Sequence, residues 1–99
     1  MSNVVELVSF KLKEGSSVAD FLVASDKFNE DFVSKQKGYI SRKLLNYGEV
    51  WSDLVIWETM EYAQNAAKAI HESPAAGVYL PFLDANSIEM HHHSVEKSY

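Results

Sequence analysis

The stretch WSDLVIWE, residues 51–58, runs straight into TMEYAQNAAKAIH, residues 59–71, and this junction decides the fold class. The first segment is rich in β-branched and aromatic side chains, which favours a strand. The second segment places Ala63, Ala66 and Ala67 at helical intervals, which is typical of an amphipathic helix. We therefore predict a strand that passes into a helix with almost no loop between them.

The flanking segments supply the remaining strands and helices. Ser17 and Asp20 have the spacing of a helix N-terminal capping box, and Gly38 suits the end of the helix that follows. Ser73 and Pro74 favour the start of another, short helix. In chain order we expect a strand over residues 3–12, a helix over 18–36, strands over 39–47 and from 50 or 51 to 57, a helix over 60–72, a short helix ending between 78 and 83, and a strand over 87–95.

This order is the split βαβ, or ferredoxin-like, arrangement of the α+β class, in which one four-stranded antiparallel sheet carries its helices on one face. Both faces of the sheet are expected to be apolar, because Val8 and Phe10 point to one side of the first strand while Val5 and Leu7 point to the other. A sheet with one face in water would alternate apolar with polar residues. We therefore predict a homodimer in which a second copy covers the second face and buries roughly 800 Å² per subunit.

Composition excludes several classes of function. Ninety-nine residues with 46% hydrophobic content fit one domain over residues 1–99. The formal charge of -5, without a Lys/Arg cluster, argues against nucleic acid as a partner. No apolar run approaches the roughly 20 residues of a membrane span. The chain has no cysteine, which excludes disulfides and thiolate metal sites and agrees with a cytoplasmic location.

Three segments carry a resemblance to a known family: GYISR over residues 38–42, LVIWE over 54–58, and HESP over 71–74. With these motifs and its order of elements, the chain resembles the dimeric α/β-barrel superfamily, and within it the antibiotic-biosynthesis-monooxygenase-like group. The resemblance implies that two sheets meet in a barrel and that each subunit keeps a pocket between its own sheet and helices. The group includes cofactor-free monooxygenases of phenolic polyketides, haem-degrading enzymes and isomerases, so fold analogy does not fix the reaction.

The haem-degrading branch can be tested against the residues. It is similar in architecture but carries a Trp in the middle of the second helix, a later His as haem ligand, and an Asn on the first strand. Continued from Trp57 without gaps, the two helical positions fall near Ala66 and Ala76, and residues 6–8 hold no Asn. The four glycines also lack the G-x-G spacing of a phosphate-binding loop. We therefore expect no cofactor.

Three residues are candidates for catalysis. His71 lies next to the alanine stripe of the helix, and a His with its ordinary pKa of about 6.5 is a suitable proton acceptor near neutral pH. Tyr62 on the same helix is a candidate donor to a substrate anion, and His92 is an alternative proton acceptor. The alternative for His71 is an interaction with the negative end of the helix dipole.

Four residues are candidates for substrate binding. Trp57, Trp51 and Tyr79 each join a large apolar body to one polar handle, which suits a flat organic ligand, and Arg42 would stabilise an anion. The alternative is that these aromatic residues pack the core. The alanines of the helix would either let it approach the sheet closely or leave room for a ligand.

The run of three histidines in the last strand suggests a metal site, because His91 and His93 share one face with Glu89. Nothing in the sequence fixes the further ligands that a closed site needs, so we predict no metal. His92 points to the opposite face with Ile88 and Met90 and is expected to be the buried one, either in the pocket or in the dimer core.

Together these features suggest a homodimeric, cofactor-independent monooxygenase or isomerase-like enzyme that acts on a small aromatic or enolisable compound. The alternative is a non-catalytic or stress-related α/β-barrel dimer that binds a small hydrophobic molecule. The sequence does not identify the substrate, the reaction type or the pathway.

Overall fold

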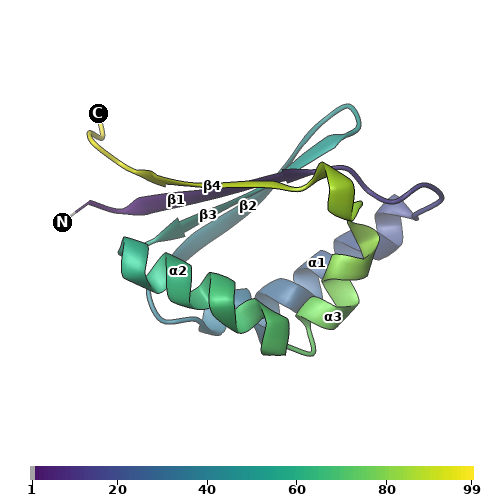
Figure 1. Cartoon of the computed structure of the whole chain (residues 1–99), viewed down its shortest axis with the longest axis horizontal. Coiled ribbons are helices and arrows are strands. Elements are labelled where there is room, and N and C mark those ends of the chain that lie inside the picture. Colours follow the sequence, from purple (N-terminus) through teal and green to yellow (C-terminus); the bar gives the residue numbers. More distant parts are fainter. Residues whose placement is uncertain (1) are drawn as a thin grey trace.

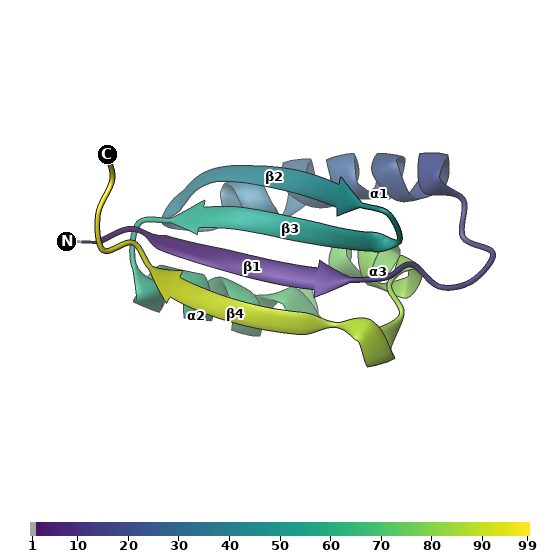
Figure 2. The same ribbon diagram turned by 90° about the horizontal axis from the view of Figure 1, so that it is seen from above.

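The computed structural model describes residues 2–99 and contains one four-stranded antiparallel sheet with its helices on one side (Figure 1). The strands lie in the order β2-β3-β1-β4, so that β3 and β1 are central (Figure 2). The elements are β1 (Val4–Phe10), α1 (Val18–Asp31), β2 (Tyr39–Tyr47), β3 (Val50–Trp57), α2 (Met60–Ala69), α3 (Ala76–Tyr79) and β4 (Glu89–Ser94). This confirms the ferredoxin-like α+β fold that the sequence predicts.

Several boundaries differ from those expected from the sequence. The helix predicted over residues 18–36 ends at Asp31, because Phe32 leaves helical geometry with φ -131° and ψ -65°, and a 3₁₀ turn over Val33–Lys35 follows. The helix predicted over residues 60–72 likewise passes into a 3₁₀ turn over Ile70–Glu72. The two terminal strands are shorter than predicted. Within residues 2–99, no helix combines the length and apolarity that crossing a membrane requires.

The sheet has two different apolar faces. Val4, Phe10, Val55 and Trp57 point towards the helices and are buried. The residues on the opposite face are only partly covered, and they include aliphatic side chains at the centre of the sheet together with polar side chains at its edges. Cross-strand register places the following residues on this open face: Val5, Leu7, Ser9, Ser41, Lys43, Leu45, Ser52, Leu54, Ile56, Glu89, His91 and His93.

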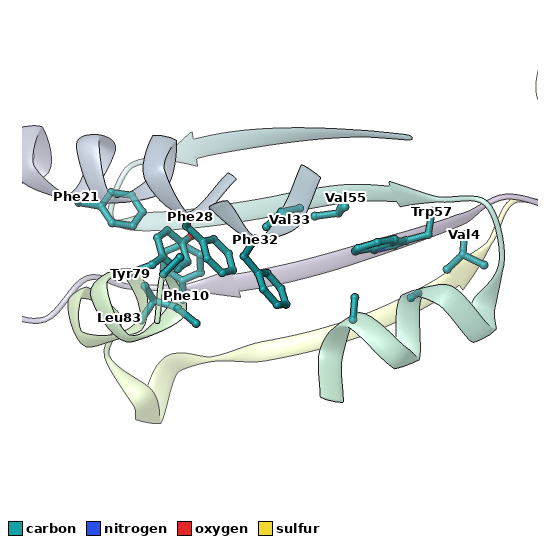
Figure 3. Packing of buried hydrophobic residues seen from close by; sticks show 14 residues of the cluster. Val4, Phe10, Phe21, Phe28, Phe32, Val33, Val55, Trp57, Tyr79 and Leu83 are labelled. Atoms are coloured by element: carbon teal, nitrogen blue, oxygen red, sulfur yellow. The ribbon is translucent and has the colours of Figure 1, made fainter. Parts of the chain in front are cut away.

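Aromatic packing joins α1 and α3 to the sheet. The rings of Phe28 and Tyr79 stack with their centroids 4.6 Å apart, and Phe10 meets Phe21 edge to face at 5.9 Å. Figure 3 shows these side chains gathered at one end of the core, while Trp57 lies nearer α2. Helix α2 faces the sheet with small residues instead. This difference in side-chain size matters for the cavity described below.

The start of α2 is fixed by contacts that involve Gly38. The N–H of Glu58 donates to the Gly38 carbonyl at 2.8 Å, and the Thr59 hydroxyl caps the helix by accepting from the N–H of Tyr62 at 3.1 Å. Gly38 has φ +88°, and a Cβ atom at this position would overlap the Tyr62 side chain. The glycine is therefore required both by its backbone conformation and by the close approach of α2.

Gly38→Ala should destabilise the protein more than Gly15→Ala. Gly15 also has a left-handed φ of +80°, but a Cβ there would meet no atom within 4 Å. Gly15→Ala therefore measures the backbone cost alone, about 1–2 kcal/mol. Overlap with Tyr62 should add about 1–3 kcal/mol in Gly38→Ala. Urea unfolding of both variants measures the difference, and equal losses would contradict this account of the α2 contact.

Candidate functional site

A cavity of about 310 Å³ lies between the helix-covered face of the sheet and the helices. This volume is at the lower end of the range for small-molecule sites, which is roughly 300–1,000 Å³. The walls are mostly apolar and come from β1, β3, α1, α2, α3 and the segments that follow α3. The apolar lining residues are Val8, Phe10, Phe28, Phe32, Val33, Val55, Ala66, Ala67, Ile70, Leu80, Leu83, Ile88 and Met90.

The cavity exists because α2 presents small side chains to the sheet. Ala63 and Ala66 are both buried, and Ala66 and Ala67 line the cavity wall. Larger residues at these positions would fill the space between the helix and the sheet. The alanine stripe therefore leaves a cavity between the helix and the sheet, and a ligand in that space stays a prediction.

Five lining residues carry polar groups: Glu6, Asp53, Trp57, His71 and Tyr79. These residues differ in whether their polar groups already form hydrogen bonds within the protein. A polar atom without a partner inside a cavity costs free energy unless a ligand or water satisfies it. The hydrogen bonds of each residue therefore indicate which of them is free to contact a ligand.

Trp57 has a polar atom without a protein partner. Its side chain is 2% exposed and its ring lies edge-on to Tyr39 at 6.3 Å. The indole N–H has no hydrogen-bond acceptor among residues 2–99. It is nevertheless near enough to the Glu6 carboxyl group to lower the pKa of that group. The cavity thus contains a buried hydrogen-bond donor, the Trp57 N–H, next to the carboxylate of Glu6.

Glu6 is paired with His92 across the two neighbouring strands β1 and β4. The two residues are directly opposite in the register, and Glu6 Oε2 lies 2.8 Å from His92 Nε2. The exposed fractions of the two side chains are 12% and 17%. Burial raises the pKa of Glu6 above its ordinary value of 4.5, although the hydrogen bond and charge of His92 partly oppose this effect.

Asp53 belongs to a closed network that links the sheet to α1 and α3. Arg42 donates from Nε to Asp53 Oδ1 at 2.8 Å and from Nη2 to Oδ2 at 2.9 Å. Two further guanidinium N–H groups, on Nη1 and Nη2, donate to the carbonyl and hydroxyl oxygens of Ser25 at 3.1 and 3.0 Å. Tyr79 donates its hydroxyl to Asp53 Oδ2 at 3.2 Å. Each carboxylate oxygen of Asp53 therefore already accepts at least one hydrogen bond.

The ionisation of this network is fixed by the same contacts. Burial would lower the pKa of Arg42, but the hydrogen bonds and charge of Asp53 outweigh it and raise that pKa. Burial, followed by the charge of Asp53, raises the pKa of Tyr79 far above its ordinary value. The Arg42 side chain also lies against the rings of Phe28 and Tyr79. Tyr79 is thus a hydrogen-bond donor in this site and not a proton acceptor.

His71 lies in the 3₁₀ turn after α2 and lines the same cavity, but its side chain is exposed. This position corresponds to the mouth of the cavity. The structure therefore brings His71, Trp57 and Tyr79 together at one cavity and brings His92 to it through Glu6. Their roles towards a ligand stay predictions.

Tyr62, Arg42 and Trp51 do not line this cavity. Tyr62 packs against Gly38, under the ammonium group of Lys37. Arg42 has its donors directed to Asp53 and Ser25, and Trp51 packs edge-on against Phe21 at 5.2 Å. Arg42 and Trp51 instead border an open groove of about 400 Å³ beside α1. The expectation that these three residues meet one ligand with Trp57 does not agree with this geometry.

His91 and His93 lie on the open face of the sheet, with ring centroids 6.2 Å apart. Within residues 2–99, no group of three or more His, Asp or Glu side chains is arranged to hold a metal ion. Glu89, which shares their strand and face, is therefore not positioned as a third ligand.

Glu6 and Asp53 are not among the site residues predicted from the sequence. A signal was present, because each is an acidic residue on the buried side of an otherwise apolar strand. Glu6 shares its side with Val4 and Val8, and Asp53 shares its side with Val55. An acidic residue in that position needs a partner or a function, since burial of an unpaired charge is costly.

Asp53→Ala should lower the free energy of unfolding by about 3–5 kcal/mol, because it leaves the buried Arg42 charge without its partner. Asp31→Ala provides a matched control, since Asp31 forms an exposed pair with Lys27 at 3.8 Å. That substitution should cost less than about 1 kcal/mol. Urea unfolding measures both, and a small loss in Asp53→Ala would show that the network does not hold the helices to the sheet.

No protein-family model matches the chain, and no curated protein matches it in sequence. Solved structures do match its fold. A variant of SnoaB, a cofactor-independent oxygenase from Streptomyces nogalater, is 14% identical with a TM-score of 0.78, and the match covers 99% of this chain and 97% of that one. A provisionally assigned antibiotic biosynthesis monooxygenase from Bordetella bronchiseptica is 16% identical with a TM-score of 0.80, over 100% of both chains.

A dimeric ferredoxin-like protein from an uncultured marine organism also matches, with 11% identity and a TM-score of 0.65 over 100% of this chain and 92% of the other. At these identities the likeness concerns the fold. The structural neighbours agree with the resemblance drawn from the sequence. The chain has the ferredoxin-like fold of the antibiotic-biosynthesis-monooxygenase-like proteins.

Proposed function

We propose that the protein is a cofactor-independent monooxygenase or isomerase-like enzyme that acts on a small aromatic or enolisable compound. The observation that carries this proposal is the cavity of about 310 Å³, which combines apolar walls with a buried carboxyl group and an unpaired indole N–H. Apolar walls suit a flat hydrophobic molecule, and the few polar groups would orient it. The fold shared with a cofactor-independent oxygenase supports the same class of chemistry.

The proposed chemistry begins with removal of a proton from the substrate. The electron pair of the broken bond remains on the substrate, and the resulting anion then reduces molecular oxygen from solution. For a methylene carbon, CH₂ and O₂ give C=O and water, so one oxygen atom enters the substrate and the other leaves as water. In the isomerase-like variant the proton returns to a different atom. Neither route calls for a flavin, haem or metal, in line with the expectation from the sequence.

We also propose a homodimer formed through the open face of the sheet. The centre of this face is aliphatic, with Val5, Leu7, Leu54 and Ile56 only partly buried within one chain. An apolar patch of this kind usually marks an interaction site. A structural neighbour described as a dimeric ferredoxin-like protein supports the formation of a dimer. A cytoplasmic location is proposed from the lack of cysteine alone.

Oxygen uptake tests the enzymatic proposal. Purified protein should consume oxygen with a member of a panel of naphthols, hydroquinones and anthrones in the presence of a chelator and without an added cofactor. Ala67→Phe should lower this uptake by about 10²-fold, because the larger side chain fills the cavity and displaces the substrate. Lys68→Phe is the matched control, because Lys68 is the exposed neighbour on the same helix. Saturable binding without uptake would contradict an enzyme and favour the non-catalytic binding protein.

Leu54→Lys should convert the dimer to a monomer, because it places a charge at the centre of the proposed interface. Sedimentation should detect a wild-type dimer at micromolar protein and a monomer of the variant. Lys27→Leu on the exposed side of α1 changes charge away from this face and should leave the dimer intact. A wild-type monomer under these conditions would contradict the proposal.

A further inference from the structure

We propose that Glu6 is the catalytic base of the cavity, that His92 positions it, and that the Trp57 N–H binds the carbonyl oxygen of the substrate. The substrate class that fits this pair is a neutral, flat carbonyl compound with an acidic C–H bond next to the carbonyl group. The inference rests on the proposed function only in taking the cavity as the ligand site. It adds a base, an oxygen-binding donor and a substrate class.

The register of the sheet brings the two groups together. Glu6 on β1 pairs with Val55 on β3, and Trp57 is two residues further along the same face. Diagonal neighbours of this kind are within reach of long and aromatic side chains. Both residues line the cavity. A ligand that lies against this wall would therefore meet one hydrogen-bond donor and one proton acceptor side by side.

The other polar residues of the cavity are less suited to be the base. Asp53 already accepts hydrogen bonds from Arg42 on both oxygens and from Tyr79 on one. His71 is exposed at the mouth, where water competes for its ring nitrogens. The Glu6 carboxyl group has one hydrogen bond, between Oε2 and His92 Nε2, and the nearby Trp57 N–H has no hydrogen-bond partner, so Oε1 can take a proton.

The chemical step is a proton transfer. The C–H bond next to the carbonyl group breaks, its proton forms an O–H bond on Glu6, and its electron pair moves into the enolate. The negative charge thus moves from Glu6 to the enolate oxygen, which accepts the hydrogen bond from Trp57. His92 holds Glu6 Oε2 at the partly exposed edge of the sheet on β4. The O–H proton on Glu6 exchanges with water, and a proton then returns from Glu6 to the enolate carbon, which restores the carboxylate.

Several charged and titratable groups face Glu6 and determine its pH dependence. His92 on β4 and the indole N–H of Trp57 lower its pKa, whereas burial and the charge of Asp53 on β3 raise it. His71 reaches the same cavity from the turn after α2. The activity should rise with pH as Glu6 loses its proton, with a midpoint above 4.5, the ordinary value for a glutamate. His92→Leu removes an interaction that lowers the pKa of Glu6, so it should move this midpoint to higher pH.

Hydrogen–deuterium exchange of β-tetralone tests the inference without requiring oxygen. This flat bicyclic ketone has one carbonyl oxygen with acidic C–H bonds beside it, and its exchange in D₂O is followed by proton NMR. Wild-type protein should accelerate the exchange. Glu6→Gln should lower the rate by about 10²- to 10⁴-fold, the usual effect of losing a general base. Trp57→Phe should lower it by about 10²- to 10³-fold, as for the loss of an oxyanion donor.

The controls separate catalysis from folding. Glu61→Gln makes the same change on the exposed surface of α2 and should keep the wild-type rate. Urea unfolding compares the stability of Glu6→Gln with that of the wild type. The raised pKa of Glu6 means that its ionised form is costly when buried, so the wild type loses stability as pH rises above 4.5. The free energy of unfolding of Glu6→Gln should therefore rise relative to that of the wild type over this pH range. If Glu6→Gln does not fold, Glu6→Asp, which retracts the carboxylate, should lower the rate instead.

The outcomes distinguish this inference from the proposed function. If β-tetralone exchange depends on Glu6 but no substrate supports oxygen uptake, the result supports Glu6 as the base and contradicts the proposed oxygenase activity. Oxygen uptake that Glu6→Gln leaves unchanged would overturn the base and leave the oxygenase standing. A wild-type protein that does not accelerate β-tetralone exchange, or a His71→Ala variant that loses more activity than Glu6→Gln, would also overturn the inference.

Discussion

The buried ion pair between Arg42 and Asp53 is the interaction on which the rest of the structure depends. It joins neighbouring strands β2 and β3 by two hydrogen bonds of 2.8 and 2.9 Å. Its remaining contacts reach α1 through Ser25 and α3 through Tyr79. Burial of two charges is favourable only when the geometry is good and other hydrogen bonds are made. The network therefore fixes the distance between the sheet and two helices at one end of the core.

The other end of the core is built differently, and the cavity results from this contrast. Near α3, aromatic rings such as Phe28 and Tyr79 stack closely and form the wall of the cavity at that end. Near α2, alanines face Trp57 and the middle of β1, so that the helix does not fill the space above the sheet. Protein interiors are normally close-packed. A cavity that also contains an unpaired donor and a carboxyl group of raised pKa is consistent with a site for ligand and proton transfer.

Local chemistry made most of the fold predictable. The β-branched and aromatic residues of the strands and the Ser17 cap each act within a few residues, and the strands and the helix start that they predict agree with the structure. Helix ends were less predictable, because the backbone leaves helical geometry at Phe32 as a result of packing. The site was predictable in part. His71, predicted from its place after the alanine stripe, and Trp57, predicted from its place at the end of β3, both line the cavity. Glu6 needs a partner 86 residues away in the sequence. The pairing of Glu6 with His92 follows only from the register of the sheet. That Arg42 is already hydrogen-bonded follows only from the network around Asp53.

The most direct test of the account follows the two indole N–H signals of the protein by NMR during titration with β-tetralone. The chain has two tryptophans, so each variant Trp57→Phe and Trp51→Phe assigns one signal. We expect the Trp57 signal to shift downfield as its N–H gains an acceptor, while the Trp51 signal stays in place because Trp51 lies outside the cavity. A shift of the Trp51 signal alone, or no shift of either signal at saturating ketone, would contradict the account.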